Sequence, residues 1–126
     1  MSSLTEQEKL EQQNERQRKY DQMVFLAMKA VAKAMSCESA QIHTHLFYGE
    51  TAADPCNLVA WYVFRTDKCV DEAKRSGLSH RMVGLTRKEL IRNGYPAKAI
   101  SRIKISFTSD EDIQNKTDGN YWKYFQ

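Results

Sequence analysis

The sequence predicts an α+β protein: a three- to four-stranded antiparallel or mixed sheet with helices packed on it, and a long N-terminal helix. Apolar residues recur at helical spacing over 20–35 and at strand spacing over 41–48. The composition, 41% apolar and 28% charged, is typical of globular proteins. Because 126 residues fit one domain, we expect a single α+β domain over 20–126, preceded by a polar helical arm over 1–19.

The first helix is predicted to begin near Thr5, where Thr5-Glu6-Gln7-Glu8 and the overlapping Ser3-Leu4-Thr5-Glu6 both fit a capping box. Its first half, 6–19, contains Leu10 as the only large apolar residue, so it is either a solvated helical arm or frayed. From Tyr20 onward an apolar stripe predicts packing against a core, and the helix should end near Ser36.

Two strands are predicted next. Residues 41–48 alternate in polarity, whereas 58–66 are apolar on both faces, as expected of a central strand. The linker 49–57 contains glycine, Asp-Pro and asparagine, which favours an antiparallel hairpin with a long loop.

Two helices should follow. Thr66 can cap a helix that runs to Ser76 and is closed by Gly77, and a second helical stretch covers 79–93. Gly84 lies inside this stretch and costs about 1 kcal/mol relative to alanine, so the segment is expected to be one helix or two pieces.

The last third predicts a strand over 103–107 and a short helix capped by Ser109. A turn at Asp118-Gly119-Asn120 precedes residues 121–125, which we expect to form a final strand.

Charge is distributed unevenly around a net value of +3. Residues 65–104 hold 11 basic and 4 acidic side chains, whereas 1–64 hold 6 and 8, and 105–126 hold 2 and 4. Such a basic block points to an acidic or polyanionic partner.

Metal binding is one possible role for His43 and His45, whose spacing on a strand would place both rings on the same side. With His80 or a cysteine they would complete a zinc site. The alternative, favoured by the lack of a further ligand at diagnostic spacing, is two polar residues on an exposed face. The cysteines, Cys37, Cys56 and Cys69, are odd in number and are expected to be reduced thiols.

No catalytic signature emerges, so we expect a protein that is not an enzyme and uses no cofactor. The five glycines form neither a dinucleotide-binding nor a P-loop pattern. Cys69, at the start of a predicted helix, is either an activated thiol or a small packed residue, and the second interpretation is favoured.

The longest apolar run, Leu58 to Phe64, is seven residues, and the N-terminal residues are charged where a signal peptide would be apolar. We therefore expect a cytoplasmic protein with no membrane contact.

Two sets of residues are candidates for binding a partner. Arg81, Lys88 and Arg92 share one face of the predicted helix, with Arg87 beside them. This face is either a docking surface or an ordinary solvated face. The second set is the C-terminal aromatic cluster, including Tyr121, Trp122 and Tyr124, which either closes the core or forms an exposed binding cluster.

The stretch Ser106-Phe107-Thr108-Ser109-Asp110-Glu111-Asp112-Ile113, followed by Gly119-Asn120-Tyr121-Trp122-Lys123-Tyr124-Phe125, resembles the small immunity proteins of bacterial contact-dependent growth inhibition systems. Size and α+β layout agree with that resemblance. It implies a cytoplasmic protein that binds a cognate toxin and blocks the toxin's active or partner-binding site. Many immunity proteins against nucleases are acidic, so a basic middle implies a toxin with an acidic face, or contact through the acidic ends.

We therefore favour a binding protein that neutralises a toxin. The alternative is a nucleic-acid-binding regulator that uses the basic 65–104 segment for phosphate contacts. The predicted aromatic residues do not interleave with the basic ones, which favours a protein partner.

Overall fold

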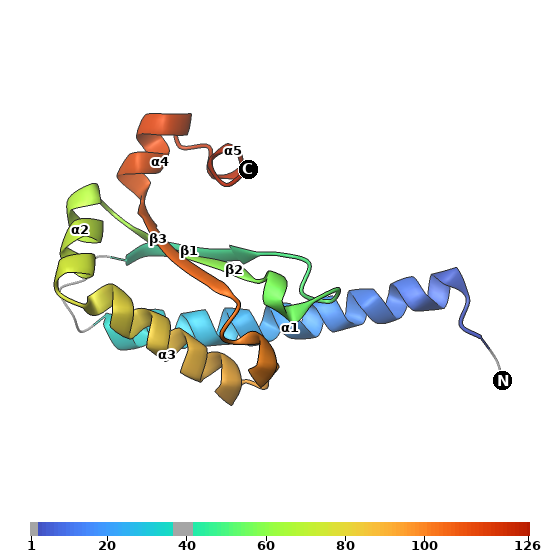
Figure 1. Cartoon of the computed structure of the whole chain (residues 1–126). Helices are drawn as coiled ribbons and strands as arrows, with labels where there is room; N and C mark the ends of the chain where they lie inside the picture. The colour runs from blue at the N-terminus through green and yellow to red at the C-terminus, as the bar shows by residue number, and fades with distance from the viewer. Residues whose placement is uncertain (1–2, 37–41) are drawn as a thin grey trace.

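The computed structural model describes residues 3–36 and 42–126 and confirms the α+β class with a long N-terminal helix (Figure 1). Gln41, the predicted start of the first strand, lies outside the described residues. The elements, apart from two short 3-10 turns, are α1 (Glu6–Met35), β1 (Ile42–Tyr48), β2 (Val59–Phe64), α2 (Asp67–Arg75), α3 (Leu78–Arg92), β3 (Lys104–Ser109), α4 (Asp110–Thr117) and α5 (Tyr121–Tyr124).

The sheet has three strands in the order β1-β2-β3. Strands β1 and β2 pair antiparallel, as the predicted hairpin requires, and β2 is the central strand. Strand β3 pairs parallel to β2, with Val59 opposite Lys104 and Phe64 opposite Ser109. The sheet is therefore mixed. Because parallel neighbours need a crossover connection, α2 and α3 lie between these two strands in the chain.

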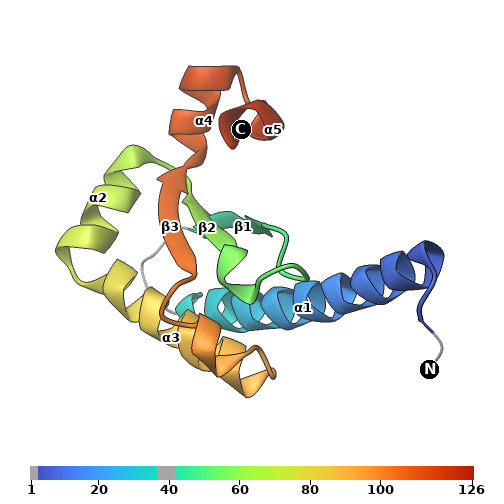
Figure 2. The ribbon, with the colours of Figure 1, turned by 45° about the vertical axis from the view of Figure 1, so that its right-hand side comes forward.

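Helices α1 and α3 cover one face of the sheet and build the main core there (Figures 1 and 2). The buried tyrosine of the central strand, Tyr62, shares a hydrogen bond of 2.7 Å between its hydroxyl and that of Thr86 on α3. The Thr86 hydroxyl lies 2.7 Å from the Met82 carbonyl oxygen, to which it donates. This polar chain is satisfied inside the core, which otherwise consists mainly of apolar side chains, among them Val24, Met28, Val31, Phe64 and Leu90.

Helices α4 and α5 lie on the opposite side of the sheet, above the strands in Figure 1. Val63 on β2 and Ile113 on α4 are fully buried but are not part of the main core. Val63 points away from the main core because it alternates with Tyr62 and Phe64 along the strand. The sheet thus carries apolar side chains on both faces, as its sequence predicts.

Helix α1 begins after the N-cap Thr5, whose side chain accepts a hydrogen bond from the Glu8 backbone N–H, and its C-cap is Ser36. The helix is continuous, and residues 6–16 are exposed. Arg16 and Gln17 tie α1 to the body: the Arg16 guanidinium donates to the Ala52 carbonyl oxygen at 3.4 Å, and the Gln17 side chain bonds the Thr51 hydroxyl and the Ala52 backbone N–H, each at 2.9 Å. The arm projects beyond this contact (Figure 2).

Helix α3 runs unbroken from Leu78 to Arg92, so Gly84 does not divide it. A methyl group at Gly84 or at Gly77 would meet no atom within 4 Å. The two glycines differ in backbone conformation, because Gly77 has φ +82° and Gly84 is helical.

Gly84→Ala is expected to stabilise the protein by about 0.5–1 kcal/mol, because alanine restricts the unfolded chain and fits the helix. Gly77→Ala is expected to destabilise it by about 1–2 kcal/mol, because a left-handed backbone penalises a side chain. Urea denaturation of both variants measures the difference. Equal effects of the same sign would contradict this assignment of the two backbones.

The predicted final strand is wrong: Tyr121–Tyr124 form the short helix α5. Asn120 caps it by accepting a hydrogen bond from the Lys123 backbone N–H at 3.0 Å. In a strand the aromatic residues would alternate between two faces. In the helix, Tyr121, Tyr124 and Phe125 turn toward the body of the protein, and Trp122 turns to solvent.

Candidate partner-binding surface

The C-terminal segment is fixed to the rest of the protein by two tyrosine hydroxyls. The Tyr121 hydroxyl donates to the Asp110 carboxylate at 2.6 Å. The Tyr124 hydroxyl donates to the Asp112 carboxylate at 2.5 Å and lies 2.7 Å from the Thr108 hydroxyl on β3. Both acids belong to the first turn of α4, where the helix dipole favours negative charge. These contacts hold α5 in one orientation.

Between α5 and the strand β1 lies a cleft lined mainly by apolar side chains, which we call the aromatic cleft. Its lining residues are Leu46, Tyr48, Tyr121, Trp122, Phe125 and Gln126. Phe125 forms one wall, and its ring centroid lies 6.4 Å from that of Tyr48 and 5.2 Å from that of Trp61. The Trp61 indole N–H donates to the Tyr48 hydroxyl at 3.1 Å. The cleft is therefore a rigid aromatic surface with polar atoms at its rim.

Trp122 is 77% exposed and Tyr48 41% exposed. An indole in water leaves a large apolar area unburied, and such side chains dominate the binding energy of protein interfaces. Tyr124, the other predicted aromatic contact, lines a neighbouring pocket that shares Tyr48, Phe125 and Gln126 with the aromatic cleft. Two of the three predicted aromatic residues thus share the aromatic cleft, and Tyr124 packs edge-on against the Phe125 ring, with the ring centroids 4.9 Å apart.

The predicted basic residues lie elsewhere. Arg81, Arg87, Lys88 and Arg92 are all exposed on α3, and Arg92 Nη1 lies 3.5 Å from the Glu89 carboxylate. Since α3 covers one face of the sheet and α5 lies over the other, the two predicted sets form separate surfaces. Sequence spacing could group the basic residues with one another, but it could not relate them to the aromatic residues.

The structure adds Leu46 and Tyr48 to the predicted site, and the strand pattern did contain a signal for them. The two residues are two apart on β1 and therefore share the sheet face opposite the main core. Tyr48 pairs with Val59, and Leu46 pairs with Trp61. Their place beside the C-terminal residues depends on the helical turn of α5, which was predicted as a strand.

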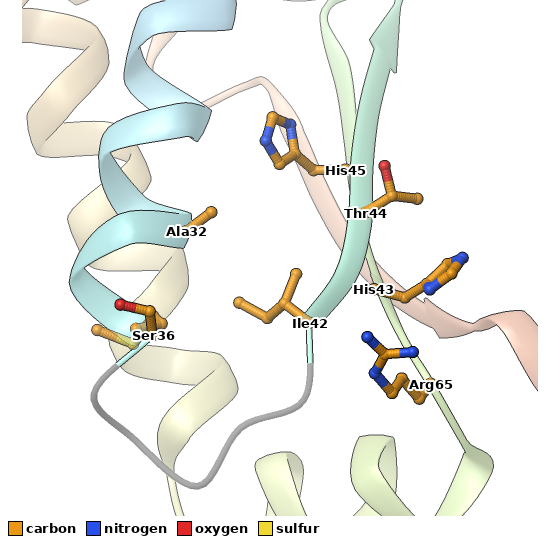
Figure 3. Close-up of a pocket in the computed structure, with 8 residues that line it drawn as sticks. Ala32, Ser36, Ile42, His43, Thr44, His45 and Arg65 are labelled. Carbon is orange, nitrogen blue, oxygen red and sulfur yellow. The ribbon is translucent and has the colours of Figure 1, made fainter.

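His43 and His45 do not share a side of β1, contrary to the sequence prediction (Figure 3). The register shifts between Ile42 and Thr44, so an extra residue in the strand reverses the alternation there. His45 points toward α1, and burial lowers its pKa below the ordinary value. His43 points away, and its Nε2 lies 3.9 Å from the Asp110 carboxylate.

A pocket between the end of α1 and β1 is lined by both histidines and by Arg65, among others (Figure 3). Among residues 3–36 and 42–126 no group of three or more histidine, cysteine, aspartate or glutamate side chains is placed to hold a metal ion. His80, a suggested third ligand, is exposed on α3. Cys37, another candidate, lies outside the described residues. Cys69 is half-buried and accepts a hydrogen bond from the Thr66 hydroxyl at 3.1 Å.

The attachment of α5 should weaken in acid. The Tyr121 and Tyr124 hydroxyls hold the pKa values of Asp110 and Asp112 below their ordinary value of 3.8. A lowered pKa in the folded state means that these carboxylates contribute stability above pH 3.8, which is lost as pH falls through the lowered values.

Fluorescence of Trp61, which touches Phe125, reports on this attachment. In a Trp122→Phe background, Trp61 is the only tryptophan of the chain, and we expect its emission to change between about pH 5 and pH 2. Tyr121→Phe combined with Tyr124→Phe removes both hydroxyls and should abolish that acid transition. A transition of the same size in the double variant would contradict the assignment.

Comparisons with protein-family models, with curated proteins and with solved structures find no match to this chain. Within the described part of the chain, no helix combines the length and apolar character needed to cross a membrane.

Proposed function

We propose that this chain is an immunity protein that binds a cognate bacterial toxin in the cytoplasm through the aromatic cleft. It would neutralise the toxin by covering its active site or a site that the toxin needs for a partner. The observation that carries the proposal is the exposed indole of Trp122, 77% accessible beside an apolar cleft. Large exposed apolar side chains in one cluster are typical of interaction surfaces.

The rigidity of the cleft supports tight binding. Tyr121 is fixed by Asp110, and Tyr124 is fixed by Asp112 and Thr108, so little conformational entropy remains to be lost when a partner binds. Tryptophan and tyrosine are the residue types that most often dominate interface energies. Steric occlusion requires no reacting group in the inhibitor. The proposal therefore depends on shape and affinity alone.

The C-terminal segment that supplies most of the cleft is acidic overall, although Lys116 and Lys123 are the charged residues beside Phe125. The cleft lies mostly in the C-terminal segment 105–126, which holds four acidic and two basic residues. Exposed Glu111 and Asp118 belong to this segment. Of the two arrangements expected from the sequence, contact through an acidic end therefore agrees better with the location of the cleft. Opposite charges would accelerate the encounter, and the aromatic contacts would slow dissociation.

The test is co-expression. Immunity genes normally accompany the gene of their toxin, so the product of the gene immediately upstream should be expressed in bacteria with and without this chain. We expect growth arrest by that product alone, rescue by the chain, and co-purification of the two proteins. A toxic neighbour that this chain neither binds nor suppresses would refute the proposal.

The basic face of α3 supports the second candidate, a nucleic-acid-binding regulator. Exposed Arg87, Lys88 and Arg92 are suited to phosphate contacts. Two exposed aromatic residues that could stack on bases, Tyr48 and Trp122, lie on the other side of the sheet, and the third, Phe25, lies on α1. This candidate predicts binding to DNA or RNA whose log affinity falls steeply with log salt concentration. No gel shift with either nucleic acid at low salt would exclude it.

A further inference from the structure

Strand β1 is an edge strand, and beyond the bulge between Ile42 and Thr44 its residues 44–48 lack the usual protection against pairing with another chain. Its sequence, Ile-His-Thr-His-Leu-Phe-Tyr, contains no lysine, arginine, aspartate, glutamate or proline. Exposed edges are normally blocked by charges, by proline, by a β-bulge or by a covering element. Within the described residues, the backbone of β1 makes hydrogen bonds only to β2, so alternate N–H and C=O groups point outward along the other edge.

The opposite edge of the sheet, β3, is guarded. It begins with the exposed Lys104, and α2 lies beside it in Figure 2. The end of β3 is tied to α2 because the Ser109 hydroxyl donates to the Asp67 carboxylate at 2.5 Å. The Asp67 backbone N–H in turn donates to Glu111 at 3.0 Å. The difference between the two edges makes β1 the one available for pairing.

Apolar side chains flank the open edge on both layers. On the α5 side these are Leu46 and Tyr48. On the helical side it is Phe25, 49% exposed. On the other flank of α1, Met23 faces the segment just after α3. Its terminal methyl group lies 3.6 Å from the point where a Cβ atom at Gly94 would be.

Phe25 is two residues after Met23 and therefore lies on the opposite flank of α1, about 200° around the helix. Ala32, seven residues after Phe25 and so on the same flank, lines the pocket formed with β1. Phe25 is thus on the flank of α1 that faces the β1 edge. A partner at this edge would meet apolar surface above and below its strand.

We propose that a second copy of this chain pairs with β1 in antiparallel fashion, so that two three-stranded sheets join into one of six strands. A twofold axis perpendicular to the sheet relates the copies. It places α1 beside α1 on one face, and one aromatic cleft beside the other on the opposite face. This axis places the helical layer of one copy beside the helical layer of the other, and α5 beside α5. The apolar residues on both faces of the edge then meet apolar residues of the second copy.

Self-pairing meets no charge repulsion within β1. Because β1 has no acidic or basic residue other than its histidines, antiparallel pairing brings no two permanent charges of the same sign together. Centred on His45, the pairing would set Thr44 opposite Leu46 of the other copy, beyond the bulge between Ile42 and Thr44. A β-branched and an aliphatic side chain pair well across strands. The proposal does not require the partner of the aromatic cleft to be a toxin, although Leu46 and Tyr48 belong both to that cleft and to the β1 edge.

The experiment is sedimentation-velocity ultracentrifugation of the full chain over about 1–100 μM, a range that brackets the affinity expected of a weak to moderate homodimer. We expect dimers to increase with concentration. Phe25→Glu should raise the dimer dissociation constant at least about tenfold. The matched control is Leu26→Glu, since Leu26 is 42% exposed and lies about 100° further around the helix, away from the edge. Thermal melting shows whether both variants are folded.

Hydrogen exchange locates the interface. Amide protons of residues 42–48 should exchange more slowly at high than at low protein concentration, and Phe25→Glu should remove that difference. A monomer throughout the concentration range would overturn the proposal. A dimer weakened equally by Leu26→Glu, or one without concentration-dependent protection of β1, would also overturn it. Trp122→Ala is expected to leave the dimer intact. A failure of the dimer proposal can therefore be distinguished from a failure of the proposed toxin binding.

Discussion

Phe64→Ala is expected to lower the free energy of unfolding by about 3–5 kcal/mol, the usual cost of removing a buried phenylalanine ring. Phe64 is fully buried at the end of the central strand, and its ring centroid lies 6.1 Å from that of Phe107 on β3. Since domains of this size are stable by only about 5–15 kcal/mol, the variant should be close to unfolding at ambient temperature.

Urea denaturation followed by circular dichroism measures this loss. Phe64→Leu, which keeps most of the buried volume, is the control and should cost clearly less. If the free energy of unfolding of the alanine variant is within about 1 kcal/mol of that of the original protein, Phe64 is not packed as the structure shows. A cavity of this size lowers the stability by more than that.

Trp122→Ala is expected to weaken binding to the cognate toxin by at least about 30-fold, equivalent to about 2 kcal/mol. The indole contributes little to folding because 77% of it is exposed, so the melting temperature should remain unchanged. The affinity is measured by isothermal titration with the toxin that this chain suppresses.

The control for this substitution is Ile91→Ala. Ile91 is also an exposed apolar residue, 51% accessible, but it lies on α3, across the sheet from the aromatic cleft. Its removal should change neither affinity nor stability. Equal losses from the two substitutions, or no loss from Trp122→Ala, would show that the toxin does not contact the aromatic cleft.

Local signals in the sequence predicted most of the fold. The caps at Thr5, Thr66 and Ser109 all lie where helices begin, because each hydroxyl satisfies a backbone N–H that has no partner within the helix. Alternating polarity located β1, because successive side chains of a strand point to opposite faces, and an apolar run on both faces located the central strand β2. The parallel partner of β2 could not be chosen this way, because strand order depends on the crossover by α2 and α3.

The candidate site was predicted only in part. Tyr121 and Trp122 were identified by composition, but the helix that aims them depends on one capping side chain, Asn120, and on hydroxyl contacts with Asp110 and Asp112. The prediction for His43 and His45 failed because a single extra residue in β1 reverses the facing of a side chain. Neither a bulge nor a long-range hydrogen bond has a signature in local periodicity.

The parallel pairing of β2 with β3 has a kinetic consequence. Mostly helical proteins fold fast because their contacts are local, yet here Val59 must meet Lys104, 45 positions further along the chain. The β1–β2 hairpin and the α2–α3 pair can each form early. The backbone groups along one edge of the central strand β2 stay unpaired until β3 docks. Refolding should therefore be slower than that of a helical bundle of equal length, and the hairpin with its two open sides is the species most exposed to aggregation.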